Sequence, residues 1–155
     1  MRIKVINQAI TLLVLILALS GCSVERNNTT TQGILGAGTH LVNVEKLEVY
    51  HFHATRQCYT CKTVGAFSEE TVNTYFSDEL KSGKLVFAHV NIDLAENKAL
   101  VDKYETKGSS LLIGVYGKDG TFSKQEDTNV WYKISDKEEY LNYLKGVIEQ
   151  KLSGN

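Results

Sequence analysis

The sequence predicts one α/β domain behind a short export segment, and three observations support this prediction. Strand and helix patterns alternate from Lys46 onward, an order typical of helices packed on a sheet. The chain has 155 residues, of which 43% are hydrophobic, so it can build one ordinary core. Its formal net charge is −1, which provides no basic surplus, and we therefore expect no nucleic-acid partner.

The expected elements follow from hydrophobic periodicity and from turn residues. The stretch KLEVYHFHA alternates and is rich in strand formers, whereas KLVFAHVNID and SLLIGVYG are apolar runs typical of buried strands. Gly83 is the expected stop of the first helix, and GKDGT is a hairpin turn. Capping-box spacing, Asp93 with Glu96 and Ser135 with Glu138, indicates the starts of the later helices. In order, we expect a strand at 46–54, a helix at 58–81, a strand at 84–93, a helix at 93–105, a strand at 110–117, a short edge strand after the hairpin, and a last helix ending near 152.

Residues 1–21 are interpreted as a lipoprotein signal peptide. Arg2 and Lys4 precede an apolar run of ten residues that is too short to span a bilayer, which takes about 20 residues. The following LSGC resembles the lipobox of bacterial lipoproteins, which implies that Cys22 carries lipid and anchors the mature chain outside the cytoplasm. The alternative is an ordinary export signal that leaves Cys22 as a spare thiol. Residues 22–44 are then the lipidated N-terminus and a flexible tether, and residues 45–155 form the domain.

Cys58 and Cys61 are the only thiols left if Cys22 carries lipid, since the chain has three cysteines. Their spacing places them one helical turn apart at the expected start of a helix. Unpaired N–H groups and the positive end of the helix dipole stabilise a thiolate there, so Cys58 is the expected attacking thiol. Cys61 lies on the same helix face and is placed to resolve a mixed disulfide.

Three segments in this order resemble thioredoxin: FHATRQCYTCK, VNID and KYETKGSSLLIGVYGKDG. The resemblance implies a thioredoxin fold, with a central mixed sheet of about four strands flanked by helices. It also implies thiol-disulfide exchange with a protein thiol or disulfide partner, here at the membrane surface, and with no bound organic cofactor. The first segment is also similar to lipoprotein-anchored thioredoxin-like proteins of bacterial arsenic-resistance and nitroreductase gene clusters.

Two positions depart from the thioredoxin pattern. Ser109 or Ser110 takes the place of the family's cis-proline, so we expect a trans peptide and a remodelled substrate groove, because a cis bond before a non-proline residue costs about 3 kcal/mol. His51 takes the place of a buried acid, so no carboxylate is expected to assist the thiols from that position.

Two other functions stay open at this point. The first is a binding or delivery module for a soft metal or metalloid (Cu, Zn or As), with Cys58, Cys61 and His53 as ligands; His51 shares the strand face of His53. The second is a redox-inert adaptor, because one fold hosts many functions. His89 lies in an apolar strand and is interpreted as a core residue.

Overall fold

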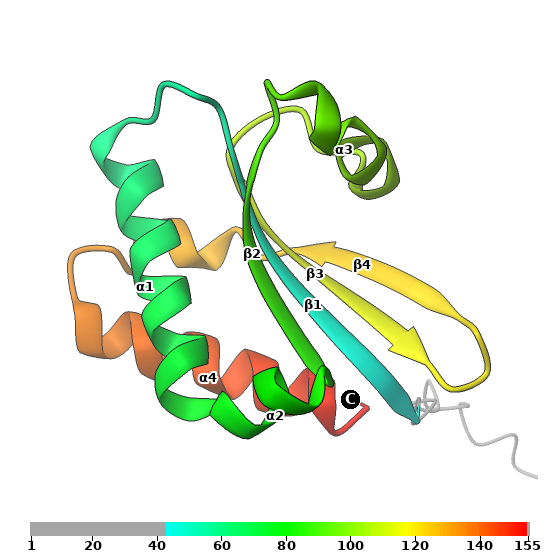
Figure 1. Ribbon diagram of the computed structural model, residues 1–155. Coiled ribbons are helices and arrows are strands. Elements are labelled where there is room, and N and C mark those ends of the chain that lie inside the picture. Colours follow the sequence, from blue (N-terminus) through cyan, green and yellow to red (C-terminus); the bar gives the residue numbers. More distant parts are fainter. Residues whose placement is uncertain (1–42, 155) are drawn as a thin grey trace, which may run out of the picture. The chain divides into compact units, whose positions relative to one another are not determined.

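The computed structural model describes residues 43–154 (Figure 1). The predicted signal peptide, Cys22 and almost all of the tether lie outside these residues, so the proposed division of the chain stays a prediction. None of the helices within residues 43–154 is long and apolar enough to cross a bilayer.

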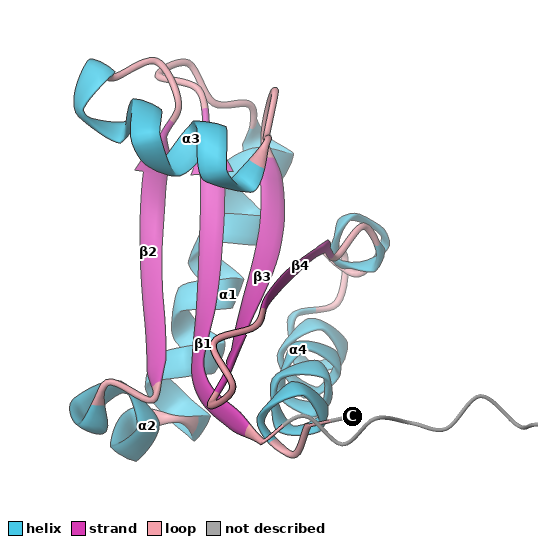
Figure 2. Cartoon of the chain, turned by 90° about the vertical axis from the view of Figure 1, so that its right-hand side faces the viewer, coloured by secondary structure: helices cyan, strands magenta, loops and turns pink. Residues whose placement is uncertain are grey.

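A four-stranded mixed sheet forms the centre of the domain. Its strands are β1 (Val44–His53), β2 (Leu85–Asn91), β3 (Ser110–Gly117) and β4 (Phe122–Glu126). The spatial order is β2-β1-β3-β4, where β2 runs parallel to β1 and the other neighbours are antiparallel (Figure 2). This sheet and the helices that flank it confirm the predicted α/β fold class of the thioredoxin type.

Helices cover both faces of the sheet. The α-helices are α1 (Tyr59–Tyr75), α2 (Ser77–Ser82), α3 (Lys98–Tyr104) and α4 (Lys137–Leu152), and the short 3-10 helices are η1 (Ala95–Asn97) and η2 (Asn129–Tyr132). In Figure 2, α3 lies in front of the sheet, whereas α1 and α4 lie behind it.

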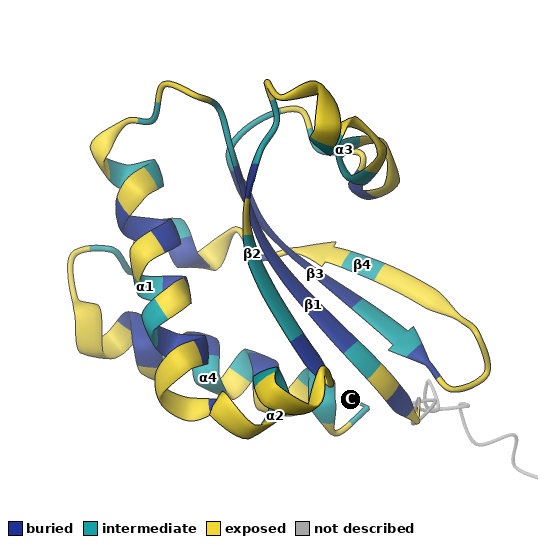
Figure 3. Ribbon diagram, in the orientation of Figure 1, coloured by how far each residue is buried: buried dark blue, intermediate teal, exposed yellow. Residues whose placement is uncertain are grey.

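Side chains of β1 alternate between two cores, because successive residues of a strand point to opposite faces. Leu47 and Val49 join the larger core beneath α1 and α4, and Tyr50 and Phe52 join the smaller core around α3. His51 follows the first set and is 1% exposed. The central strands are therefore buried on both faces, as Figure 3 shows.

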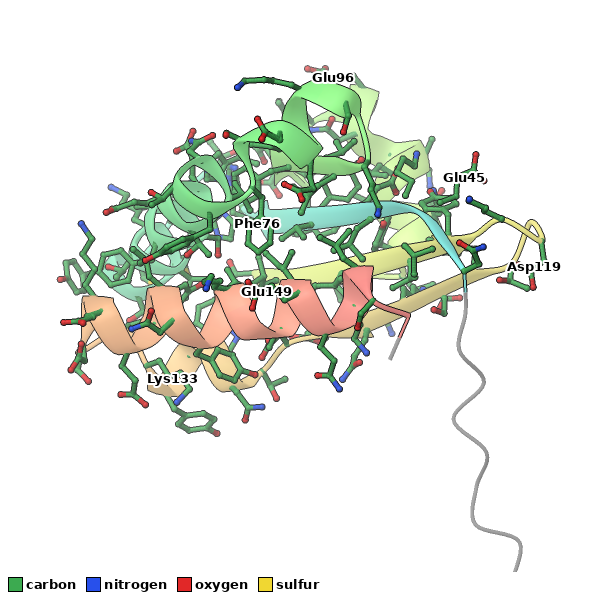
Figure 4. All side chains as sticks on the ribbon, turned by 90° about the horizontal axis from the view of Figure 1, so that it is seen from below. Glu45, Phe76, Glu96, Asp119, Lys133 and Glu149 are labelled. Carbon is green, nitrogen blue, oxygen red and sulfur yellow. The ribbon has the colours of Figure 1, made fainter. Side chains whose placement is uncertain are left out.

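The helix predicted at 58–81 is in fact two helices. Phe76 leaves helical geometry at φ −130° and ψ 31°, and it separates α1 from α2 (Figure 4). Its side chain is almost fully buried in the larger core, so packing of one aromatic ring outweighs continuation of the helix. Gly83 ends α2 with φ 75°, as predicted.

The two predicted capping boxes are also revised. Asp93 caps neither η1 nor α3, since no side chain caps either of them. At α4 the cap is Asp136, one residue after Ser135, and its carboxylate accepts the Glu139 N–H at 3.0 Å. Aspartate is as good an N-cap as serine, so sequence spacing alone did not separate the two positions.

Candidate dithiol site

The cysteine pair lies where the chain passes from β1 to α1 (Figure 1). Cys58 is the N-cap of α1, with an extended backbone at φ −74° and ψ 170°. Its Sγ accepts the Cys61 N–H at 3.3 Å, which satisfies one of the backbone donors that a helix start leaves unpaired. The sequence prediction of a thiol at a helix start is thus confirmed in position.

The two thiols face each other and are not bonded. Their Sγ atoms lie 2.8 Å apart, against about 2.05 Å in a disulfide. Cys58 is exposed and Cys61 is half-buried. Hydrogen bonds from the Cys61 thiol and then from the Cys61 main-chain N–H lower the pKa of Cys58. An exposed sulfur with a lowered pKa is chemically suited to nucleophilic attack, and its neighbour is suited to follow it.

The loop between β1 and the cysteines is held by the end of β2. Thr55 donates its main-chain N–H to Asp93 Oδ2 at 2.8 Å, and Asn91 donates its side-chain N–H to Thr55 Oγ1 at 3.0 Å. The hydrogen bonds from Thr55 also lower the pKa of Asp93. Asp93 therefore anchors the loop that presents the dithiol. The sequence did not predict this role, because an aspartate just before a helix is first interpreted as its N-cap.

The histidines occupy the α1 side of the sheet. His51 lies beneath α1, and its Nδ1 is 3.0 Å from His89 Nδ1. His89 was predicted to be a core residue, and this was wrong: it is exposed, because β2 is an edge strand. Burial, with smaller effects from His89 and His53, lowers the pKa of His51 to about 4. His51, which takes the place of a buried acid in the thioredoxin pattern, is thus a neutral imidazole at pH 7.

The donors of the alternative metal site are Cys58, Cys61 and His53. Within residues 43–154, no three or more His, Cys, Asp or Glu side chains are placed together so as to hold an ion, and this includes Cys58, Cys61 and His53. The Nδ1 of His53 instead lies 2.9 Å from the carbonyl oxygen of Ala54.

The two serines lie at the start of β3. Ser110 is buried and pairs in register with Phe52, and its hydroxyl lies 2.9 Å from Thr106 Oγ1. Ser109 directly precedes the strand. Residues 43–154 contain no cis peptide bond. Both serines line a hollow of about 340 Å³ on the α3 side, which neither cysteine lines.

Tyr59, which directly follows Cys58, is 79% exposed.

The aromatic residues Trp131 and Tyr132 follow β4 and lie in η2, and they differ in exposure. Trp131 packs against the larger core, whereas Tyr132 is 84% exposed.

Comparisons with known proteins show similarity in structure only. No family model matches the chain, and no curated protein matches it. Among solved structures, it is similar to the Trx4 domain of ERdj5, with 14% identity, a TM-score of 0.45, and coverage of 71% of this chain and 86% of that one.

Two further solved structures are similar to the chain. The zinc-bound form of human ERp44 shares 18% identity at a TM-score of 0.42; the match covers 69% of this chain and only 29% of that one. The Drosophila melanogaster thioredoxin Deadhead shares 20% identity at a TM-score of 0.37, with coverage of 64% and 79%.

Proposed function

We propose that this chain is a thiol-disulfide oxidoreductase that works through Cys58 and Cys61. The observation that carries the proposal is the N-cap geometry of Cys58, whose sulfur accepts the Cys61 N–H while the Cys61 sulfur lies 2.8 Å away. Exchange needs only one activated thiolate and one resolving thiol. Because the two sulfurs carry the electrons themselves, the reaction needs no bound organic cofactor.

The proposed reaction has two displacement steps. The Cys58 thiolate attacks one sulfur of a partner disulfide, so a bond between Cys58 and the partner forms while the partner's S–S bond breaks and its other sulfur leaves as a thiolate. Cys61 then loses its proton to solvent and attacks Cys58 Sγ. The Cys58–Cys61 disulfide forms, the partner's second thiolate leaves, and two electrons have passed from the chain to the partner. The steps run in reverse with a dithiol partner.

The substrate groove is proposed to run past the two serines, Ser109 and Ser110, of which one takes the place of the cis-proline. Ser110 directs its hydroxyl toward Thr106, on the side of the sheet that holds α3. Ser109 lies in the bend just before β3 and also lines the hollow on that side, so both serines stay candidates for the groove. A serine in that position offers a hydroxyl and a main-chain N–H, since it lacks the ring of proline.

We infer that the domain works outside the cytoplasmic membrane, tethered by lipid on Cys22. Support comes from the LSGC sequence and from the polar segment that separates it from β1. The partner is then a protein thiol or disulfide at the membrane surface. The similarity of residues 52–62 to lipoprotein-anchored thioredoxin-like proteins of arsenic-resistance and nitroreductase gene clusters agrees with this location.

A trapping experiment tests the assigned roles. In full-length chains that carry Cys22→Ser, Cys61→Ser should accumulate a stable mixed disulfide at Cys58 when it is treated with oxidised glutathione. The matched variant Cys58→Ser should form its mixed disulfide at least about tenfold more slowly, because Cys61 is half-buried and lacks the N-cap position. Equal rates for the two variants, or faster trapping at Cys61, would contradict the assignment.

A further inference from the structure

A second cluster of reactive side chains lies where β1, β2 and α1 meet. It comprises His51 and His53 of β1, His89 of β2 and Glu69 of α1, which together line a hollow of about 300 Å³. The His51 ring is stacked on the His53 ring at a centroid distance of 5.4 Å, and it meets the His89 ring edge-on at 5.2 Å. Neither cysteine lines this hollow, although their sequence neighbours Gln57 and Lys62 do.

Two of the three imidazoles are held in a tautomer that leaves one nitrogen open. His89 Nε2 lies 3.4 Å from Glu69 Oε2, and because a carboxylate only accepts, Nε2 donates and Nδ1 keeps its lone pair. His53 Nδ1 donates to the carbonyl oxygen of Ala54 at 2.9 Å, which leaves the lone pair on Nε2. Metal-binding histidines usually donate their second N–H to a carboxylate or a carbonyl in this way.

The third imidazole, His51, is buried and incompletely satisfied. Its Nε2 has no hydrogen-bond partner, although the ring is only 1% exposed. Its Nδ1 lies 3.0 Å from His89 Nδ1 and donates to it, because His89 Nδ1 keeps its lone pair. His51 is therefore a buried ring whose Nδ1 faces His89 and whose Nε2 is free to take a proton.

Gly65 of α1 leaves room for the rings of His51 and His89, which lie against it. A Cβ at this position would lie 2.6 Å from His51 Nδ1 and 3.1 Å from His89 Cε1. Any other residue would push the rings apart, even though glycine is a poor helix former. Glycine thus preserves the close approach of the two Nδ1 atoms.

We propose that His51 and His89 bind a borderline divalent metal ion such as Zn²⁺ through their Nδ1 atoms, with His53 as the third ligand and water as the fourth. Two nitrogens on a tetrahedral zinc ion at about 2.0–2.1 Å are about 3.3 Å apart, close to the 3.0 Å between these atoms. The ion replaces the hydrogen between the two rings, and the His51 proton moves to Nε2. Imidazole donors select such ions over Mg²⁺ and Ca²⁺.

Closure of this site requires one ring to turn, since no set of three ligands is assembled in the part of the chain that the structure describes. His53 Nε2 can swing toward the pair by rotation about χ2, a torsion with a broad energy profile in histidine, and this rotation releases Nδ1 from the Ala54 carbonyl oxygen. Glu69 remains on His89 Nε2 and orients that ring. His51 and His89 are thus the preformed half of the site.

Zinc titration of a chain without thiols tests the proposal. The full-length chain with Cys22, Cys58 and Cys61 all changed to serine is titrated with Zn²⁺ in competition with a chromophoric chelator at pH 7.5. We expect one Zn²⁺ per chain. His89→Ala should weaken binding at least tenfold, and Glu69→Gln should weaken it by about tenfold or more. Both side chains are at least one-third exposed, so these variants should keep the fold.

Matched controls separate this site from other zinc ligands. Glu70→Gln alters the next carboxylate on α1, which pairs with Lys137, and His40→Ala removes the remaining histidine of the chain; neither should change the affinity by more than twofold. Gly65→Ala should abolish binding without removing a ligand, because the new Cβ separates the rings. Failure of the thiol-free chain to bind Zn²⁺, or unchanged binding in His89→Ala, would overturn the proposal. Disulfide exchange is measured separately and does not depend on this result.

Discussion

Glu48 of β1 is a buried carboxylate whose replacement should reduce the stability of the domain. It is 5% exposed and accepts hydrogen bonds from Lys46 at 2.7 Å, Tyr116 at 2.7 Å and Tyr104 at 2.8 Å. Burial raises the pKa of Glu48, but these three hydrogen bonds and the charge of Lys103 outweigh burial and lower it to about 2. The folded state therefore favours the ionised carboxylate.

The size of the effect follows from linkage between ionisation and folding. The pKa falls from 4.5 to about 2, and at about 1.4 kcal/mol per pH unit this corresponds to about 3 kcal/mol of stability at pH 7. Because the folded pKa is the lower one, this stability is fully present above pH 4.5 and is lost as the pH falls toward 2. Glu48→Gln, which removes the charge and keeps the shape, should lower the free energy of unfolding by about that amount at pH 7.

Urea unfolding between pH 2.5 and pH 7, followed by the fluorescence of the single tryptophan Trp131, measures this difference. The variant and the unmodified chain should differ by about 3 kcal/mol at neutral pH and converge as the pH approaches 2. Glu45→Gln on the same strand is the control, and it should change stability by less than about 0.5 kcal/mol because Glu45 is exposed. A difference below about 1 kcal/mol, or one that does not change with pH, would refute the reasoning.

Three other outcomes are expected. Iodoacetamide near neutral pH should label Cys58 well before Cys61, as peptide mapping by mass spectrometry would show; equal labelling would remove the distinction between the thiols. Gly114→Ala should destabilise the domain by about 1–3 kcal/mol or more in thermal unfolding, because the new Cβ would meet the Tyr104 hydroxyl at less than van der Waals contact; an unchanged midpoint would contradict this packing. Cys22→Ser should release the chain from the membrane fraction of expressing cells, whereas a membrane-bound variant would argue against a lipid anchor.

Local patterns predicted most of the elements and the position of the dithiol. The alternation in KLEVYHFHA and the helix start at Cys58 depend on residues that are near each other in the sequence, and both are confirmed. The hairpin at 117–121 is likewise local; in the structure it leads directly into β4. These features follow from backbone periodicity and turn chemistry, which do not depend on the rest of the fold.

The features that were missed depend on contacts between distant segments. The break between α1 and α2 depends on the burial of Phe76 in a core that other elements build. The hydrogen bond between Thr55 and Asp93 joins residues that are 38 positions apart in the sequence. His89 is exposed because the sheet order places β2 at the edge. An apolar run in the sequence predicts a strand but does not indicate whether that strand is at the edge of the sheet. The approach of His89 to His51 has the same origin, although a glycine inside the α1 helix pattern at Gly65 was a usable signal of close packing.

The central claim, reversible exchange at Cys58 and Cys61, is tested most directly by equilibrating the Cys22→Ser chain in glutathione buffers of defined ratio. Quenched samples analysed by mass spectrometry give the fraction that contains the intramolecular disulfide. We predict a single two-electron transition between dithiol and disulfide, with no transition in Cys58→Ser or Cys61→Ser, since the reduced sulfurs already lie 2.8 Å apart. If the chain stays reduced at every ratio while the dithiol binds Cu(I) or Zn²⁺ tightly, the oxidoreductase account is contradicted and a metal-binding function takes its place.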